Sequence, residues 1–155
     1  MNSDFLLLIM SSINKGKNIN LVGYGNSGKT CYARCLGGKG EKYHHWLNGL
    51  VYTIQHEGNV YNAWDTDGDQ HVYMDGFIVM FDLTSKHSYE SIESWIENAR
   101  ESNPEAPIVV CGNKCESENI EVNKEQIDSL KKKYIYVEMS VNDHKNIFKP
   151  FEYFA

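Results

Sequence analysis

The stretch Gly23-Tyr24-Gly25-Asn26-Ser27-Gly28-Lys29-Thr30 matches the pattern G-x-x-x-x-G-K-[ST]. It follows residues 19–22, Ile-Asn-Leu-Val, which predict a short buried strand. It precedes a helical segment that Gly37 and Gly38 would end. A strand before the loop and a helix after it are the context that the motif requires. Glycines let successive backbone N–H groups turn toward a phosphate, and the helix adds the positive end of its dipole. We therefore predict a phosphate-binding loop at residues 23–30.

A nucleotide and a magnesium ion are the ligands that this loop predicts. Lys29 is expected to reach the outer phosphates, and Thr30 is expected to bind Mg²⁺. Asp65 follows the strand-like residues 60–64, so it is expected to hold the same Mg²⁺ through a water molecule, while Gly68 offers a backbone N–H to the terminal phosphate. The predicted metal ligands are thus Thr30 and Asp65. The predicted phosphate-binding residues are Gly23, Gly25, Asn26, Ser27, Gly28, Lys29, Thr30, Cys31 and Gly68.

A second motif, Asn113-Lys114-Cys115-Glu116, follows the apolar run at residues 108–111. An amide and a carboxylate three residues apart can read both edges of guanine. Asn113 would contact O6 and N7, and Glu116 would accept hydrogen bonds from N1–H and the N2 amino group. Adenine offers no such pair of donors, so a carboxylate at this position selects guanine.

Apolar runs typical of strands alternate with segments of helical spacing along the chain. The predicted strands after the loop are residues 50–56, 60–64, 77–81, 108–111 and 134–139, with a hairpin turn at Glu57-Gly58-Asn59. Ser88 is the expected N-cap of a helix over residues 92–99, and Asn123 with Gln126 predicts a capping box for a later helix. A last short helix is predicted from Ile147, Phe148, Phe151 and Phe154. Alternation of this kind favours a mostly parallel sheet covered on both faces.

The composition predicts one globular domain spanning residues 1–155. Of its residues 41% are hydrophobic and 23% are charged, and its longest apolar run is residues 5–10. A membrane-spanning helix needs about 20 apolar residues, so the run at residues 5–10 is too short to be one. Residues 1–17 are instead expected to form an N-terminal extension, whose apolar run packs on the domain or contacts a partner or membrane surface. The formal net charge of −6 disfavours a general nucleic-acid binder. We expect a monomer in a reducing compartment, the cytoplasm or the nucleus.

Four cysteines form two pairs with C-x-x-x-C spacing, Cys31 with Cys35 and Cys111 with Cys115. Zinc sites usually have closer C-x-x-C spacing and a closed set of four ligands. We therefore expect structural thiols rather than a metal site.

The sequence resembles the Ras superfamily of small GTPases, and its second half is most similar to the Ran branch, the nuclear-transport GTPases. The resemblance covers residues 19–154 and is carried by Trp64-Asp65-Thr66, Met80-Phe81-Asp82-Leu83-Thr84-Ser85, Tyr89, Trp95, residues 107–114, Ser140, Asn146 and Lys149-Pro150-Phe151. It implies an α/β fold of the Ras-like P-loop NTPase type, with a six-stranded, mostly parallel sheet and one antiparallel edge strand. It also implies a second guanine loop in which the backbone N–H of Val141 meets the base. The guanine-binding residues are then Asn113, Lys114, Glu116, Ser140, Val141 and Asn142.

Several positions depart from the family pattern. The guanine motif ends in Glu116 instead of Asp, which moves the carboxylate by about 1.5 Å. Asp69, followed by Gln70, stands where the family has the Gln that orients the attacking water, and an anionic side chain there should repel a γ-phosphate. Trp46 stands where the Mg²⁺-binding Thr of the family would align. Residues 65–76 form a short link between two predicted strands, so the second-switch helix should be shortened or absent.

These departures leave three functions open. The first is a guanine-nucleotide-binding protein with slow or absent GTP hydrolysis, at a degenerate catalytic site formed by Asp69 and Gln70. The second is a pseudo-GTPase that acts as a protein-interaction module or a mimic of Ran. The third is a small nucleotide kinase, but such enzymes clamp the phosphoryl group with arginines, and this chain has only Arg34 and Arg100. The resemblance implies partners among nuclear-transport factors or other regulators of small GTPases. Because no cysteine follows Cys115, no lipid anchor is expected.

Overall fold

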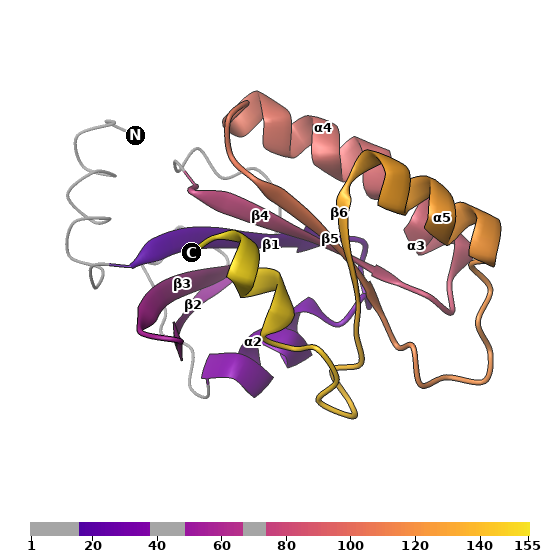
Figure 1. Cartoon of the computed structure of the whole chain (residues 1–155), viewed down its shortest axis with the longest axis horizontal. Helices are drawn as coiled ribbons and strands as arrows, with labels where there is room; N and C mark the ends of the chain where they lie inside the picture. The colour runs from indigo at the N-terminus through magenta and orange to yellow at the C-terminus, as the bar shows by residue number, and fades with distance from the viewer. Residues whose placement is uncertain (1–15, 38–48, 67–73) are drawn as a thin grey trace.

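A six-stranded sheet forms the centre of the part of the chain that this computed structural model describes, residues 16–37, 49–66 and 74–155 (Figure 1). The strand order is β2-β3-β1-β4-β5-β6. The strands are β1 (Lys17–Gly23), β2 (Gly49–His56), β3 (Asn59–Thr66), β4 (Gly76–Asp82), β5 (Ile108–Asn113) and β6 (Ile135–Glu138). Neighbouring strands are parallel except β2 and β3, which are antiparallel. The predicted α/β architecture with one antiparallel edge strand is confirmed.

The central strands of the sheet are buried on both faces. Every residue of β4 and β5 is buried, as expected for apolar runs at the centre of a parallel sheet. β2 and β3 are joined by a tight turn in which Glu57 and Gly58 have φ values of 48° and 78°. Two left-handed residues in a row match the twist of the strands on either side. The predicted hairpin is therefore confirmed, although Asn59 already belongs to β3, where it pairs with His56.

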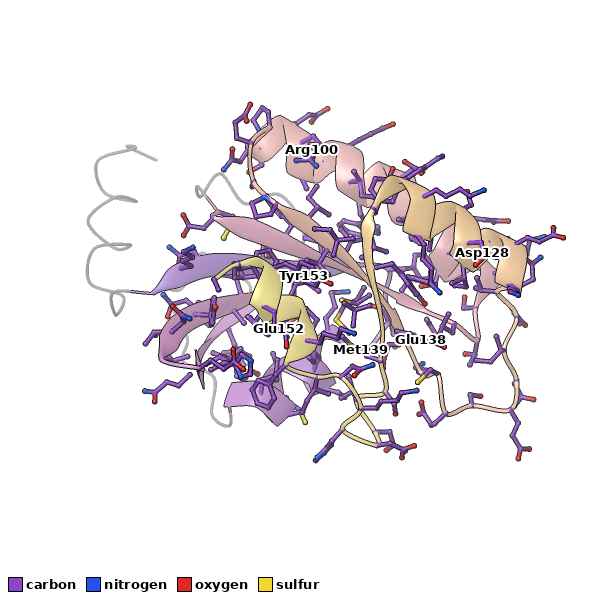
Figure 2. The ribbon with its side chains drawn as sticks, viewed as in Figure 1. Arg100, Asp128, Glu138, Met139, Glu152 and Tyr153 are labelled. Carbon is purple, nitrogen blue, oxygen red and sulfur yellow. The ribbon has the colours of Figure 1, made fainter. Side chains whose placement is uncertain are left out.

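Helices cover both faces of the sheet (Figure 1). They are α2 (Lys29–Gly37), α3 (Lys86–Glu90), α4 (Ile92–Ser102), α5 (Lys124–Lys133) and the 3₁₀ helix η1 (Lys149–Tyr153). One hydrophobic cluster joins α4 and α5 to the sheet through Ile96 and Leu130. A second cluster joins α2 and η1 to the sheet through Tyr32 and Phe151. Figure 2 shows the side chains of these layers, with Arg100 on α4 and Glu152 on η1. The two clusters lie on opposite faces, so the sheet is the middle of three layers.

The helix starts agree with the local sequence in one case and depart from it in another. The side chain of Asn123 accepts from the N–H of Gln126, and the side chain of Gln126 accepts from the N–H of Asn123, both at 2.9 Å. The predicted capping box of α5 is confirmed. The prediction that Ser88 caps α4 is wrong. Ser88 lies inside α3, which is capped by Ser85, and its Oγ accepts a hydrogen bond from the backbone N–H of Asp82 at 2.9 Å.

The last helix is present, but it is the short 3₁₀ helix η1 with Pro150 in its first turn. The ring of Phe154 packs against Gly76, where a Cβ would collide with it. Lys17 Nζ donates to the carbonyl oxygen of Phe154 at 2.6 Å. These contacts hold the C-terminal segment against the starts of β1 and β4.

Several expectations concern residues outside the described part of the chain. They are the apolar segment at residues 5–10, Trp46 in the first switch, and the second-switch segment with Gly68, Asp69 and Gln70. None of the described helices is long and apolar enough to cross a membrane.

Candidate functional site

The glycine-rich loop joins β1 to α2 at one edge of the sheet. Gly23 has a φ of 142°, and a Cβ there would collide with the carbonyl oxygen of Met80, so this position requires glycine. Asn26 has a φ of 64°, a left-handed conformation that Asn adopts more readily than most residues. Apart from Gly25 itself and its two chain neighbours, no described atom lies within 4 Å of the point where a Cβ on Gly25 would stand. Left-handed residues in such a loop turn neighbouring N–H groups to one side, which is the geometry of an anion site.

Lys29 begins α2 and folds back over the loop. Its Nζ donates to the carbonyl oxygens of Gly23 at 2.7 Å and Tyr24 at 3.2 Å. These bonds hold a positive charge at the start of α2. The N–H groups in the first turn of a helix, here including those of Thr30 and Cys31, have no carbonyl partner within the helix. The ammonium and the helix start therefore both favour an anion at this place.

The two predicted metal ligands are in contact. Thr30 Oγ1 donates to Asp65 Oδ2 at 2.7 Å. Because β1 and β3 are parallel neighbours, the loop after β1 and the end of β3 lie at the same edge of the sheet. Asp65 lies within β3, near its end, rather than after the strand. Hydroxyl and carboxylate oxygens are the kind of ligand that Mg²⁺ prefers, so this pair fits the ion.

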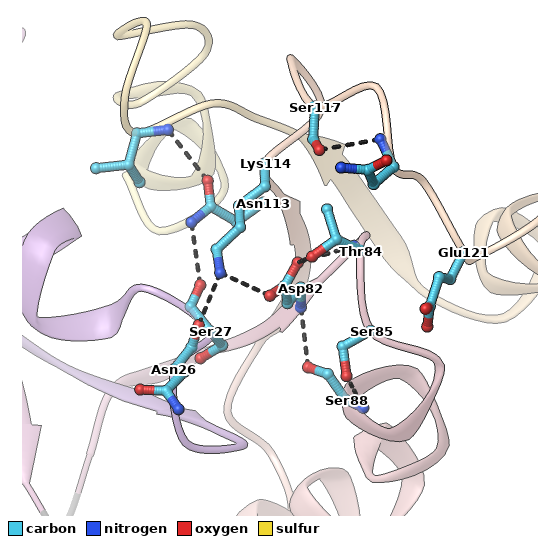
Figure 3. Close-up of polar contacts among 12 residues, drawn as sticks. Asn26, Ser27, Asp82, Thr84, Ser85, Ser88, Asn113, Lys114, Ser117 and Glu121 are labelled. Carbon is cyan, nitrogen blue, oxygen red and sulfur yellow. Dashed lines mark hydrogen bonds and ion pairs between the residues drawn. The ribbon is translucent and has the colours of Figure 1, made fainter.

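Asn113, the last residue of β5, connects two loops (Figure 3). Its Nδ2 donates to the carbonyl oxygen of Ser27 at 3.0 Å, and its Oδ1 accepts from the N–H of Val141 at 3.1 Å. Gly28 has a φ of 99°, and a Cβ there would collide with Asn113 Nδ2, so the contact depends on this glycine. Two groups expected to meet the base, Asn113 and the N–H of Val141, thus lie together and bond to each other. Their contact with guanine stays a prediction.

The remaining residues predicted to bind guanine follow β5 and β6, which are parallel neighbours. Ser140 is fully buried, and its Oγ accepts from the N–H of Asp143 at 2.9 Å. Asn142 is exposed, and so is Glu116 in the segment after β5. Ser140 therefore shapes its loop from inside, while the Glu116 carboxylate is accessible from solvent.

Asp82 is a buried carboxylate that the sequence analysis did not assign to the site. It ends β4 and is only 7% exposed, and its Oδ2 lies 2.6 Å from Lys114 Nζ. Burial raises the pKa of this carboxyl, but hydrogen bonds from Lys114 and Thr84 outweigh that effect and leave the pKa below its usual value. The carboxylate is therefore ionised at neutral pH. The signal in the sequence was an acidic residue directly after the wholly apolar residues 77–81.

The four cysteines are free thiols. Cys111 is fully buried in β5, and burial raises the pKa of its thiol, which makes it unreactive. Cys31 is exposed at the start of α2, while Cys35 and Cys115 are half-buried. Among the residues that the structure describes, no three His, Cys, Asp or Glu side chains gather where they could hold a metal ion. The contact of Cys31 with a phosphate stays a prediction, and the backbone N–H in the first turn of α2 is the group that would make it.

Comparison with models of protein families matches residues 18–155 to the Ras family. The match begins in β1 and runs through the glycine-rich loop, Asp65 and Asn113 to the last residue. It therefore includes every described residue that the sequence analysis assigned to nucleotide or metal.

Proposed function

Because the chain belongs to the Ras family of small GTP-binding proteins, we propose that it binds GDP and GTP together with Mg²⁺ and hydrolyses GTP slowly. One observation carries this proposal: three segments meet at one edge of the sheet. The loop at residues 23–30 lies beside the contact of Thr30 with Asp65, and Asn113 joins the same loop to Val141. Groups suited to phosphate, metal and base thus lie on adjoining segments, as a guanine nucleotide requires.

Each part of the nucleotide has its own residues in this proposal. Lys29 and the N–H groups at the start of α2 contact the phosphates. Thr30 and Asp65 would hold Mg²⁺, and the ion would offset the negative charge of the phosphates. Asn113 and Glu116 bind the base. The test is to release nucleotide from the purified protein and identify it by chromatography, and recovery of GDP or GTP is the expected result.

GTP hydrolysis is expected to be slower than the intrinsic rate of ~4 × 10⁻⁴ s⁻¹ that Ras itself reaches. Asp69 stands where the family has a Gln, and an anionic side chain at that position should repel the γ-phosphate and cannot donate a hydrogen bond to it. Replacing it, as Asp69→Gln, should raise the single-turnover rate several-fold. Phosphate release from preloaded GTP in excess Mg²⁺ measures both variants.

The matched control for this comparison is Asp128→Gln, which removes an exposed acid on α5 and should leave the rate unchanged. Brisk hydrolysis by the unmodified chain would show that Asp69 does not impair the reaction. An Asp69→Gln rate equal to that of the unmodified chain would lead to the same conclusion.

Glu116→Asp is expected to tighten GDP binding by about tenfold, because a shorter carboxylate restores well-aligned charge-assisted hydrogen bonds to the guanine N–H groups. Glu118→Asp changes an exposed acid in the same segment and serves as the control. Titration calorimetry with GDP and Mg²⁺ gives both affinities. Unchanged or weaker GDP binding by Glu116→Asp would mean that Glu116 does not contact the base.

A second candidate function is a pseudo-GTPase that acts through protein contacts. It is favoured by the departures from the family pattern at Trp46, Asp69 and Glu116, positions at which the family has residues for Mg²⁺, for the attacking water and for the base. Purified protein that contains no guanine nucleotide, and whose melting temperature is unchanged by GDP or GTP with Mg²⁺, would support this function over the first.

The partners and the location of the chain are further parts of the proposal. We infer that regulators of small GTPases, nuclear-transport factors among them, contact the chain in the cytoplasm or the nucleus. The support is the similarity of its second half to Ran, for example at Met80-Phe81-Asp82-Leu83-Thr84-Ser85. Binding of the GTP-loaded chain to a purified nuclear-transport receptor tests this inference. Binding that is equal for the GDP and GTP forms would argue against a Ran-like switch.

A further inference from the structure

A buried carboxylate lies behind the nucleotide site, between the end of β4 and the segment after β5. Both oxygens of Asp82 are engaged (Figure 3). Oδ1 accepts from the backbone N–H of Thr84 at 2.8 Å and from the Thr84 hydroxyl at 2.6 Å. Oδ2 lies 2.6 Å from Lys114 Nζ. The carboxylate is thus fixed by its own turn on one side and binds a lysine on the other.

The same lysine reaches the glycine-rich loop. Lys114 Nζ donates to the carbonyl oxygen of Asn26 at 3.2 Å. One ammonium therefore contacts both Asp82 and the loop before α2, although Lys114 follows Asn26 by 88 residues in the chain. Both ends of this contact have left-handed backbones, with φ of 64° at Asn26 and 67° at Lys114. Neither residue is glycine, so the surrounding contacts have to hold these conformations.

The geometry points to Asp82 as a positioning residue for nucleotide binding. It holds the Lys114 ammonium against the Asn26 carbonyl, and this fixes the part of the loop that faces the phosphates. The inference rests on the proposed function, since it concerns the retention of a nucleotide at that loop. Asp82 itself lies behind Lys114 and acts through it.

An amide cannot replace the carboxylate at this position. Asp82 receives three donors, two from Thr84 and one from Lys114, and an ionised carboxylate is an acceptor at both oxygens. In Asp82→Asn one of these places is taken by an NH₂ group. That group faces either the Lys114 ammonium or the Thr84 donors, so one contact is lost whichever way the amide turns.

The test is the rate at which a fluorescent GDP analogue leaves the protein in Mg²⁺. Asp82→Asn should release it about tenfold faster, the effect of losing one charge-assisted hydrogen bond. Ser88→Ala is the matched control. It removes the hydroxyl that accepts from the Asp82 backbone N–H at 2.9 Å and leaves the carboxylate in place. It should lower the melting temperature while the release rate stays within twofold of the unmodified chain.

A double-mutant cycle separates positioning from a general loss of structure. Lys114→Met alone should also accelerate release, and adding Asp82→Asn to it should change the rate by less than twofold, because Asp82 acts through Lys114. If Asp82 only stabilised the fold, the two substitutions would act independently, and their effects on the release rate would multiply. Should Asp82→Asn fail to fold, Lys114→Met removes the same contact from the other side, and an unchanged rate in that variant overturns the inference.

The outcomes distinguish this inference from the function on which it rests. If the unmodified chain binds no guanine nucleotide, the proposed function fails, and the inference fails with it. If the unmodified chain binds GDP and Asp82→Asn releases it at the same rate, only the role of Asp82 is overturned. The role of Asp82 is also overturned if the acceleration of release in the double variant equals the product of the accelerations in the two single variants.

Discussion

Lys29→Ala is expected to lower the affinity for GDP by more than about a hundredfold, equivalent to about 3 kcal/mol. The Lys29 ammonium is held over the loop by the carbonyl oxygens of Gly23 and Tyr24. Alanine removes this charge from the point where the phosphates are expected, and the N–H groups of α2 alone cannot replace it. Titration calorimetry with GDP and Mg²⁺ measures the change.

The control for this variant is Lys132→Ala, which removes an exposed lysine from the last turn of α5. It changes the net charge equally but lies outside the site, so GDP affinity should stay the same. Binding by Lys29→Ala within about threefold of the unmodified chain, a difference below 1 kcal/mol, would remove the basis for a phosphate site. That result would favour the pseudo-GTPase.

Asn113→Ala is expected to have the second large effect, on the fold as well as on nucleotide. It leaves the carbonyl oxygen of Ser27 and the N–H of Val141 without their partner. Losing two hydrogen bonds at a buried residue should lower the free energy of unfolding by about 3 kcal/mol. Urea unfolding of the nucleotide-free protein gives this value, and loss of GDP binding should accompany it.

Two further variants define the origin of that effect. Asn119→Ala lies in the exposed segment after β5 and should change the free energy of unfolding by less than about 0.5 kcal/mol. Asn113→Asp keeps an acceptor for Val141 but places an oxygen against the Ser27 carbonyl, so it should be nearly as harmful as alanine. Full stability in Asn113→Asp would mean that the bond to Ser27 contributes nothing.

The features that the sequence predicted correctly depend on neighbours in the chain. The strand–loop–helix unit at residues 19–37 needs only a strand-forming segment, glycines and a helix start in succession. The capping box of Asn123 and Gln126 likewise lies within four consecutive residues. Thr30 and Asp65 are farther apart in the chain. Thr30 comes shortly after the loop that follows β1, and Asp65 lies near the end of β3, so the parallel pairing of β1 and β3 brings them together. Local patterns therefore predicted the architecture and placed Thr30 beside Asp65, while the binding of nucleotide and metal by these residues stays a prediction.

The features that the sequence analysis missed depend on distant partners. Ser85, Ser88 and Ser91 recur every three residues, and each is a chemically suitable N-cap. The hydroxyl of Ser88 instead accepts from Asp82 in β4, a tertiary contact that no local pattern encodes. Asp82 was missed for a similar reason, because its cation is Lys114, 32 residues further along the chain. The apolar residues 77–81 before Asp82 indicated a buried strand end, but its pairing with Lys114 follows only from the parallel neighbours β4 and β5.

The junction at Asn113 also has a consequence for how a bound nucleotide would leave. The Asn113 amide joins the loop that is predicted to bind phosphate to the segment that is predicted to meet the base, so neither can move away alone without breaking a bond to Asn113. Displacement of either the glycine-rich loop or the segment with Val141 should weaken the other's contact with Asn113. We therefore expect the nucleotide to dissociate from both segments in one step. A protein that displaced residues 140–145 from Asn113 would then accelerate dissociation of the nucleotide without contacting its phosphates.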